Sequence, residues 1–212
     1  TEYVSSGSRE LEVADFLLSG VIALSIAQSG LFGMVGLVEI RRKGLLKRLK
    51  MTPVNMRLFG VANVGARFAL SIVQVILLTL IGVVAFRANV DFSPLTFLLI
   101  FIVGTLAFSG LGYLISAASK TLESYMGISN LVSFIMMFLS GIFIDVNVLP
   151  GYLKPVSHVM PLTYFVDGIR GGMIYGSGMN ADMWLNLAVL AAWGGVSFIL
   201  ATLLFRRRSA SL

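Results

Sequence analysis

Residues 39–57 read EIRRKGLLKRLKMTPVNMR and lie between two long apolar segments, so this short basic stretch is the reference point for the whole chain. It holds seven of the sixteen Lys and Arg residues in the sequence. Positive charges in a short loop between membrane spans keep that loop on the cytoplasmic side. The stretch therefore predicts the orientation of the spans on either side of it.

A short amphipathic helix is predicted within this loop, over residues 44–51 (GLLKRLKM). Its three leucines fall on one helical face, its three basic side chains point elsewhere, and Thr52-Pro53 ends the helix. A helix of this kind is expected to lie at the inner membrane surface. The charge pattern by itself is typical of a basic anchor on anionic lipid.

The composition is that of a membrane protein with several spans. Hydrophobic residues make up 57% of the chain and charged residues 12%, whereas a soluble domain carries about 25% charged residues. The formal net charge of +6 raises the possibility of a nucleic-acid partner. However, most basic residues fall in three short segments beside apolar spans, with no basic-aromatic surface or nucleic-acid motif. No nucleic-acid partner is therefore expected.

The sequence has too few Cys and His residues for a site built from these side chains alone. The chain has no Cys, which rules out disulfides, thiolate catalysis and Cys-ligated metals, and its single His158 cannot form a His cluster alone. The sequence starts at Thr1 without a basic segment before an apolar core, so no signal peptide is visible. No metal site and no catalytic residue are predicted.

Five membrane spans are predicted, because each apolar run is long enough to cross a hydrocarbon core that needs about 20 residues. Between them, the loops place eleven Lys and Arg residues on the inner side and four on the outer side, with Arg67 left in the membrane. The amino end is then outside and the carboxyl end cytoplasmic. The fold class is all-α, a polytopic helical bundle treated as one transmembrane domain over residues 1–212. The predicted spans are residues 16–38, 58–86, 95–119, 125–144 and 183–205.

Four polar or charged side chains fall within or beside these spans. Gln28, Gln74 and Asn130 are candidates to line a substrate route, and each is equally compatible with an interhelical hydrogen bond that serves packing. Arg67, near the inner end of its span, is expected to snorkel to the lipid headgroups. The sequence leaves the choice between route and packing open.

Small residues at spacings of four predict close helix contacts. Ser25, Ser29 and Gly33 form one such stripe on the first span, and Gly112 with Ser116 forms another on the third. Small side chains at this spacing let two helix backbones approach each other. The first stripe is a candidate surface for association with a second copy of the protein.

Residues 145–182 differ from the spans because three prolines, Pro150, Pro155 and Pro161, interrupt an apolar run. Short apolar pieces broken by Pro and Gly are typical of re-entrant or interfacial segments, which are tolerated at membrane depth only where protein or a watery cavity covers the backbone. A re-entrant segment on the outer side is therefore predicted here.

Two motifs in this chain resemble those of type-2 ATP-binding-cassette exporter permeases, and the resemblance covers nearly all 212 residues. One motif lies in the basic loop, and the other lies before the last predicted span. The matching positions in the loop are Glu39, Gly44, Leu46, Arg48, Leu49, Thr52 and Pro53. The matching positions before the last span are Ser140, Gly141, Pro150, Gly151, Pro161, Thr163, Tyr164, Asp167 and Arg170.

The resemblance implies a role for each motif. The loop, residues 39–57, is the coupling loop whose helix docks on a separate ATPase subunit, and residues 145–182 form short helices that dip into the outer leaflet. Members of the family have six spans with both ends inside, so a further span upstream of Thr1 is implied. They work as two permease copies or homologues with two ATPases. ATP and Mg then bind to the partner, and this chain carries no cofactor.

The implied function is that of a permease subunit, not an enzyme. It exports a hydrophobic or amphipathic substrate of the drug, lipid or glycan class across a bacterial or archaeal cytoplasmic membrane, in contact with membrane lipids. The sequence contains no GxxxxGK[ST] phosphate-binding loop, which fits ATP hydrolysis on another polypeptide.

Two other classes of function are weighed against this one. An intramembrane hydrolase would need a nucleophile and a base, yet His158, Asp145 and Asp167 are separated by prolines and lack a catalytic spacing. An ion- or proton-coupled carrier would place carboxylates within its spans, and none of the five predicted spans contains Asp or Glu. The carrier is the alternative retained.

Overall fold

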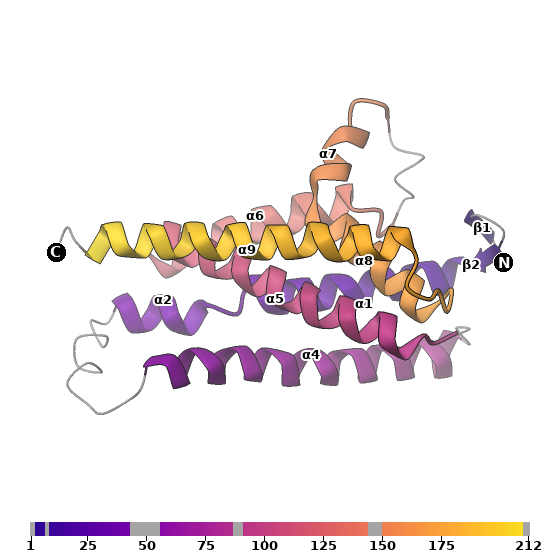
Figure 1. Ribbon diagram of the computed structural model, residues 1–212, viewed down its shortest axis with the longest axis horizontal. Coiled ribbons are helices and arrows are strands. Elements are labelled where there is room, and N and C mark those ends of the chain that lie inside the picture. Colours follow the sequence, from indigo (N-terminus) through magenta and orange to yellow (C-terminus); the bar gives the residue numbers. More distant parts are fainter. Residues whose placement is uncertain (1–2, 7–8, 43–55, 87–90, 144–149, 210–212) are drawn as a thin grey trace.

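The computed structural model describes residues 3–6, 9–42, 56–86, 91–143 and 150–209. Long helices lie side by side along one axis and form a helical bundle (Figure 1). Among the described residues, five helices are long and apolar enough to cross a membrane. The prediction of an all-α polytopic bundle with five spans in this chain is therefore confirmed.

Two short strands precede the bundle and were not predicted. They pair antiparallel as a hairpin, with Tyr3 opposite Glu12 and Ser6 opposite Arg9. The strands are β1 (Tyr3–Ser6) and β2 (Arg9–Glu12). The helices are α1 (Val13–Leu31), α2 (Val35–Arg42), α4 (Met56–Phe86), α5 (Pro94–Ala118), α6 (Leu122–Leu139), α7 (Lys154–Val159), α8 (Pro161–Met173) and α9 (Ala181–Ser209).

The bundle has two distinct ends. The end of α2, the start of α4 and the end of α9 lie together at one end, whereas the hairpin and α8 lie towards the other (Figure 1). The basic loop, residues 43–55 of which lie outside the described part of the chain, is thus flanked by two helices at the end opposite the hairpin.

Helix α5 is the central element, since it packs against α1, α8 and α9. Glycines allow these helices to approach closely. A Cβ atom on Gly30 of α1 would lie 2.7 Å from the Cβ of Phe108, and one on Gly110 would lie 3.1 Å from the carbonyl oxygen of Gly194 in α9. Gly112 faces the backbone of Gly30, so the predicted close packing at Gly112 is confirmed.

The first predicted span departs from the prediction at both ends. It was expected to be uninterrupted over residues 16–38, but the structure breaks it into α1 and α2 at residues 32–34. Gly33 lies in the break, and glycine weakens a helix interior. At the other end, α1 begins at Val13 and includes buried Asp15 in its first turn, where a carboxylate is favoured by the helix dipole.

Helix α6 is shorter than its predicted span. Its first turn is capped by the Thr121 hydroxyl, which accepts a hydrogen bond from the Ser124 N–H at 3.1 Å. It ends at Leu139 and not near residue 144, because Gly141 turns the chain with φ of 73°, a left-handed conformation that favours glycine. The chain then turns away towards α7.

Helices α7 and α8 occupy the segment that was predicted to be re-entrant. Helix α8 has 13 residues, of which 11 are buried among the long helices. At 1.5 Å per residue it extends about 20 Å, too short to cross the hydrocarbon core. Helix α7 has six residues and stands away from the bundle (Figure 1). The short helices separated by proline match the form that the sequence indicates.

Candidate functional site

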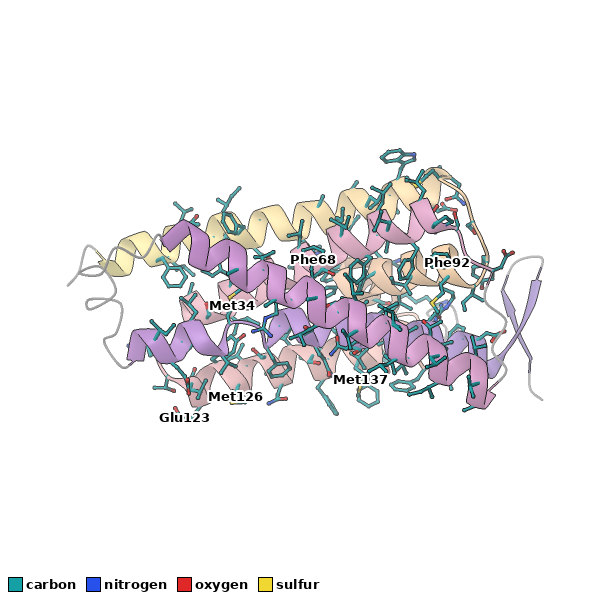
Figure 2. All side chains as sticks on the ribbon, turned by 90° about the horizontal axis from the view of Figure 1, so that it is seen from below. Met34, Phe68, Phe92, Glu123, Met126 and Met137 are labelled. Carbon is teal, nitrogen blue, oxygen red and sulfur yellow. The ribbon has the colours of Figure 1, made fainter. Side chains whose placement is uncertain are left out.

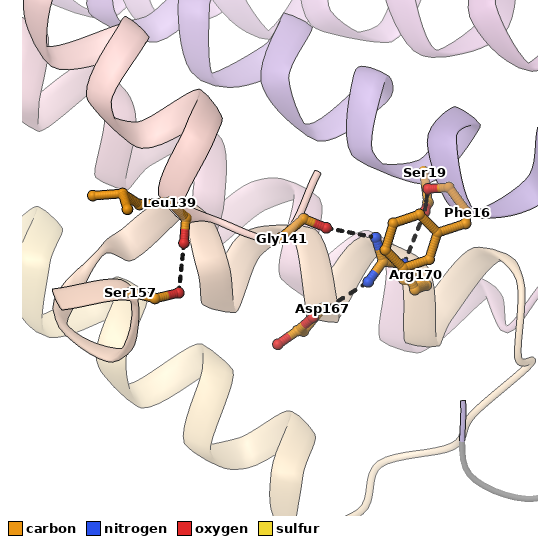
Figure 3. Close-up of polar contacts among 7 residues, drawn as sticks. All are labelled: Phe16, Ser19, Leu139, Gly141, Ser157, Asp167 and Arg170. Atoms are coloured by element: carbon orange, nitrogen blue, oxygen red, sulfur yellow. Dashed lines mark hydrogen bonds and ion pairs between the residues drawn. The ribbon is translucent and has the colours of Figure 1, made fainter. Parts of the chain in front are cut away.

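The side chain of Arg170 on α8 connects three parts of the bundle (Figure 3). Its Nε donates to the Ser19 hydroxyl of α1 at 3.2 Å, and its Nη2 donates to the Gly141 carbonyl after α6 at 3.2 Å. The guanidinium carbon lies 3.8 Å from the centre of the Phe16 ring. A cation this close to an aromatic face is attracted by the ring quadrupole. Arg170 therefore fixes α8 against α1 and the end of α6.

Asp167 contributes less to this cluster than the sequence spacing suggests. The two residues stand one helical turn apart, a spacing at which opposite charges can pair, and Oδ1 of Asp167 lies 3.7 Å from Nη1 of Arg170. The Asp167 side chain is 54% exposed, however, whereas that of Arg170 is 9% exposed. Water competes for an exposed carboxylate and weakens such a pair. The buried contacts of Arg170 with Ser19, Gly141 and Phe16 are the stronger part of the cluster.

Hydroxyl groups stabilise the corner between α6, α7 and α8. Ser157 of α7 donates to the Leu139 carbonyl at 2.5 Å, which satisfies an acceptor at the end of α6 (Figure 3). Thr163 of α8 donates to the Ser157 carbonyl at 2.7 Å, and Tyr164 donates to the His158 carbonyl at 2.7 Å. These bonds give Thr163 and Tyr164, both predicted as motif residues, a structural role at the start of α8.

A cavity of about 460 Å³ opens beside this corner. Polar side chains from α8 and α9 line it, among them Asp167, Arg170, Asp182 and Asn186. Within the described residues no three His, Asp or Glu side chains are grouped so that they could hold a metal ion. The site is therefore one of hydrogen bonding and charge, at the same end of the bundle as the hairpin.

A second candidate surface lies on α6. One side of this helix is buried, through Tyr125, Ser129, Ser133 and Met136. Large apolar side chains are exposed on the remainder. They are Met126, Ile128, Leu131, Phe134, Ile135 and Phe138. Figure 2 shows α6 beside the first span, with Met126 and Met137 marking α6 and Met34 marking the neighbouring segment.

Polar groups accompany this apolar surface at mid-helix. Gln28 of α1 donates through Nε2 to the Ser133 hydroxyl of α6 at 3.3 Å. Asn130, one turn before Ser133, is exposed. The structure thus places Gln28 at the contact between α1 and α6, where it makes the interhelical bond that was considered, whereas Asn130 is exposed on α6. Gln74 lies on α4, and its Oε1 is buried with no partner among the described residues.

The remaining predicted residues divide into two groups. Ser140 is buried at the end of α6, Pro161 is buried at the first turn of α8, and Pro150 with Gly151 is exposed in the turn before α7. Of the coupling residues only Glu39, half-buried in α2, is described. The others lie outside the described residues: Gly44, Leu46, Arg48, Leu49, Thr52 and Pro53.

Sequence reasoning missed the hydrogen bonds that two residues, Arg67 and Tyr125, make with the backbone between α1 and α2. For Arg67, expected to snorkel to the headgroups, the structure shows a partner within the bundle: its Nη2 donates to the Gly33 carbonyl at 2.7 Å. Tyr125 of α6 was not considered, yet it is fully buried and its hydroxyl contacts the backbone beside Gly33. These partners are 34 and 91 residues apart in sequence, so periodicity within one helix could not reveal them.

The sequence of this chain matches a known protein family and several other proteins. A sequence model of the family described as "ABC-2 type transporter" matches residues 3–174, from the hairpin through α8. Nodulation protein J of Rhizobium meliloti (strain 1021) is 36% identical over 103 residues, which cover 49% of this chain and 38% of the relative.

Longer matches extend over almost the whole chain. Putative transport permease YvfS of Bacillus subtilis (strain 168) is 22% identical over 204 residues, 93% of this chain and 79% of the relative. ABC transporter G family member 20 of Dictyostelium discoideum is 26% identical over 211 residues, 97% of this chain and 28% of the relative. The matched region thus spans less than half the length of the nodulation protein and of the Dictyostelium transporter.

Proposed function

The chain belongs to the ABC-2 type transporter family, and from this premise we propose that it is the membrane-spanning permease part of an exporter driven by a separate ATPase. The observation that carries the proposal is the extent of the family match, which runs from the hairpin through four spans and α8. Its spans and short outer helices are those of a multi-pass membrane subunit.

The ATPase is proposed to bind at the end of the bundle that carries the basic loop. Helices α2 and α4 end and begin there, so force applied to the loop would reach two helices at once (Figure 1). ATP and Mg²⁺ are proposed to bind to the ATPase and not to this chain, which has no GxxxxGK[ST] motif. The basic residues at this end favour a cytoplasmic position for it, and the direction of transport is proposed to be export.

The substrate path is proposed to run along the exposed face of α6 beside α1. Its apolar side chains face away from the bundle, and a second permease copy placed against them would enclose a path between the two copies. Asn130 and the Gln28–Ser133 pair supply polar groups at mid-membrane, where polar side chains mark substrate routes. Methionine and phenylalanine side chains adapt to varied apolar ligands. A hydrophobic or amphipathic substrate of the drug, lipid or glycan class fits this surface.

Uptake into inverted membrane vesicles tests the proposal. Vesicles containing the full-length protein and its ATPase are supplied with a panel of fluorescent amphiphiles, and accumulation is measured with ATP and with a non-hydrolysable analogue. ATP-dependent accumulation that survives a protonophore supports the exporter. Accumulation that needs a proton gradient but no ATP hydrolysis supports the ion-coupled carrier instead.

Asn130 provides the test of the path. Asn130→Leu removes a polar group from the proposed route, and the matched control Leu80→Asn places one on the exposed face of α4. A change in the order of preference among the amphiphiles in Asn130→Leu but not in Leu80→Asn is expected. If both variants keep the parent's order of preference among the amphiphiles, the exposed face of α6 does not line the path.

A further inference from the structure

The break between α1 and α2 has an unusual hydrogen-bond pattern. Up to Phe32 the helical pattern holds, since the Phe32 N–H donates to the Gln28 carbonyl at 2.9 Å. Gly33 then bonds three residues back, to Gly30 at 3.2 Å, and Val35 bonds to Phe32 at 3.4 Å. The four-residue pattern returns at Val38, which donates to Met34 at 3.1 Å.

Tyr125 of α6 fills the gap in this pattern. Its hydroxyl accepts a hydrogen bond from the Met34 N–H at 3.1 Å and donates one to the Leu31 carbonyl. It therefore replaces helical bonds on both sides of the break with a single atom from another helix. Insertion of a side chain into the backbone ladder is an established cause of helix kinks. The tyrosine side chain is fully buried, which limits exchange of these bonds with water.

Arg67 of α4 holds the same break from a second direction. Its Nη2 donates to the Gly33 carbonyl at 2.7 Å. The absence of a side chain at Gly33 makes room for it, because a Cβ atom there would lie 2.9 Å from Nε of Arg67. Nε itself is buried and has no acceptor among the described residues. Because the residue is half-buried, the bond from Nη2 to Gly33 is only partly exposed to competition from water.

The three helices joined here are the ones that the proposed mechanism must connect. Helix α2 leads into the basic loop and α4 leads out of it, so Arg67 ties the two flanks of the loop together at Gly33. Tyr125 stands four residues before Ser129 and eight before Ser133 on α6, the helix that carries the proposed path. One cluster thus contacts both flanks of the loop and the path helix.

We propose that Tyr125 and Arg67 are positioning residues of a joint centred on Gly33, which passes movement of the basic loop to the path face of α6. This inference rests on the proposed function and adds the route by which that function is coupled. When the ATPase displaces α2, the hydroxyl of Tyr125 draws α6 with it, while Arg67 keeps α4 in register with α2. Coupling of this kind needs an element with two arrangements, and the break between α1 and α2 is the element that we propose for it.

A staple, meaning a set of contacts that only stabilises the fold, would look the same in the structure. The joint and the staple predict different effects when the Tyr125 hydroxyl is removed. Tyr125→Phe keeps the ring and removes the hydroxyl that bonds to Met34 and Leu31. Tyr175→Phe is the matched control, because its hydroxyl is buried without a partner among the described residues. A joint predicts loss of coupling in Tyr125→Phe with normal folding, whereas a staple predicts only loss of stability.

The experiment uses the full-length protein with its ATPase in proteoliposomes, with accumulated fluorescent amphiphile and ATP turnover measured together. Tyr125→Phe is expected to lower the amount transported per ATP by about fivefold, the scale set by one buried hydrogen bond, while Tyr175→Phe matches the parent. Arg67→Met is expected to lower the amount transported per ATP by a similar factor. Arg67→Lys is expected to recover part of that loss. Equal transport per ATP in the parent, Tyr125→Phe and Arg67→Met would overturn the joint.

A second readout does not depend on transport. Spin labels at Ile40→Cys on α2 and Leu131→Cys on α6, in this cysteine-free chain, report the distance between the helices with and without ATP. The joint predicts that ATP shifts both labels together in the parent and that Tyr125→Phe changes the distance between them. The joint therefore predicts that ATP changes the distance between the labels in Tyr125→Phe and leaves it nearly unchanged in the parent. The same effect of ATP on this distance in both proteins would refute the joint. A parent that transports without ATP hydrolysis would instead refute the proposed function, before any variant is compared.

Discussion

Replacing Arg170 by Met removes the buried cation that joins α8 to α1 and to the turn after α6. The change deletes hydrogen bonds to Ser19 and Gly141 and the contact with the Phe16 ring, and it leaves a buried hydroxyl and a buried carbonyl with fewer partners. Each charged hydrogen bond contributes about 1.5–3 kcal/mol, and Met recovers part of that through its own packing. The net loss of stability is expected to be about 3–5 kcal/mol, because two such bonds are lost and Met recovers only part of their contribution.

Asp167→Asn is the matched comparison for this prediction. It removes the carboxylate from the same cluster, but the Asp167 side chain is 54% exposed, so the expected loss is about 0–1 kcal/mol. Unfolding of the purified protein in detergent, followed by Trp fluorescence at increasing denaturant, measures both variants. Equal losses in the two variants would refute the assignment of the stability to the buried contacts. A loss below about 1 kcal/mol in Arg170→Met would refute the cluster as a stabilising element.

Three further predictions concern orientation, packing and the polar pair. Single cysteines at Lys50 and Lys154 should react with an impermeant reagent from opposite sides of the membrane, and reaction from the same side would overturn the topology. Gly112→Leu should destabilise the protein by about 2 kcal/mol or more in the same unfolding assay, because the Gly30 backbone fills the space, whereas Gly127→Leu at an open position should be nearly neutral. Gln28→Leu should cost about 1 kcal/mol through the Ser133 bond, and an unchanged free energy of unfolding would show that this bond contributes nothing.

The features that sequence predicts well are those set by runs of neighbouring residues. A charge-free apolar run longer than a bilayer needs is sufficient to predict a span, and all five spans are present as helices. Pro155 and Pro161 stand in the first turns of α7 and α8, which is why the segment predicted to be re-entrant contains short helices. The pairing of Asp167 with Arg170 follows from their spacing on one helix.

The features that sequence misses depend on contacts between helices. Gly33 weakens the helix but does not by itself identify a break, since α5 contains three glycines and is unbroken. The hydroxyl that bonds to the backbone at the break comes from Tyr125, which is 91 residues from Met34. The same holds for Arg67, whose length and charge suit a headgroup contact as well as a carbonyl across the bundle. The first predicted span begins at residue 16, yet Asp15 is buried in the first turn of α1, because a helix N-terminus accommodates a carboxylate.

The coupling loop bears most directly on the central claim that a separate ATPase drives this permease. Leu46→Ala/Leu49→Ala shortens the apolar face predicted for the loop helix without changing its charge. Buried interface anchors of this kind contribute about 2 kcal/mol or more to association, and a lipid anchor would depend on charge instead.

The decisive measurement compares transport and substrate-stimulated ATP hydrolysis in this double variant with the parent at equal membrane abundance. We expect unchanged insertion, weaker association with the ATPase and loss of both activities. Full transport and full stimulation in Leu46→Ala/Leu49→Ala would contradict the account.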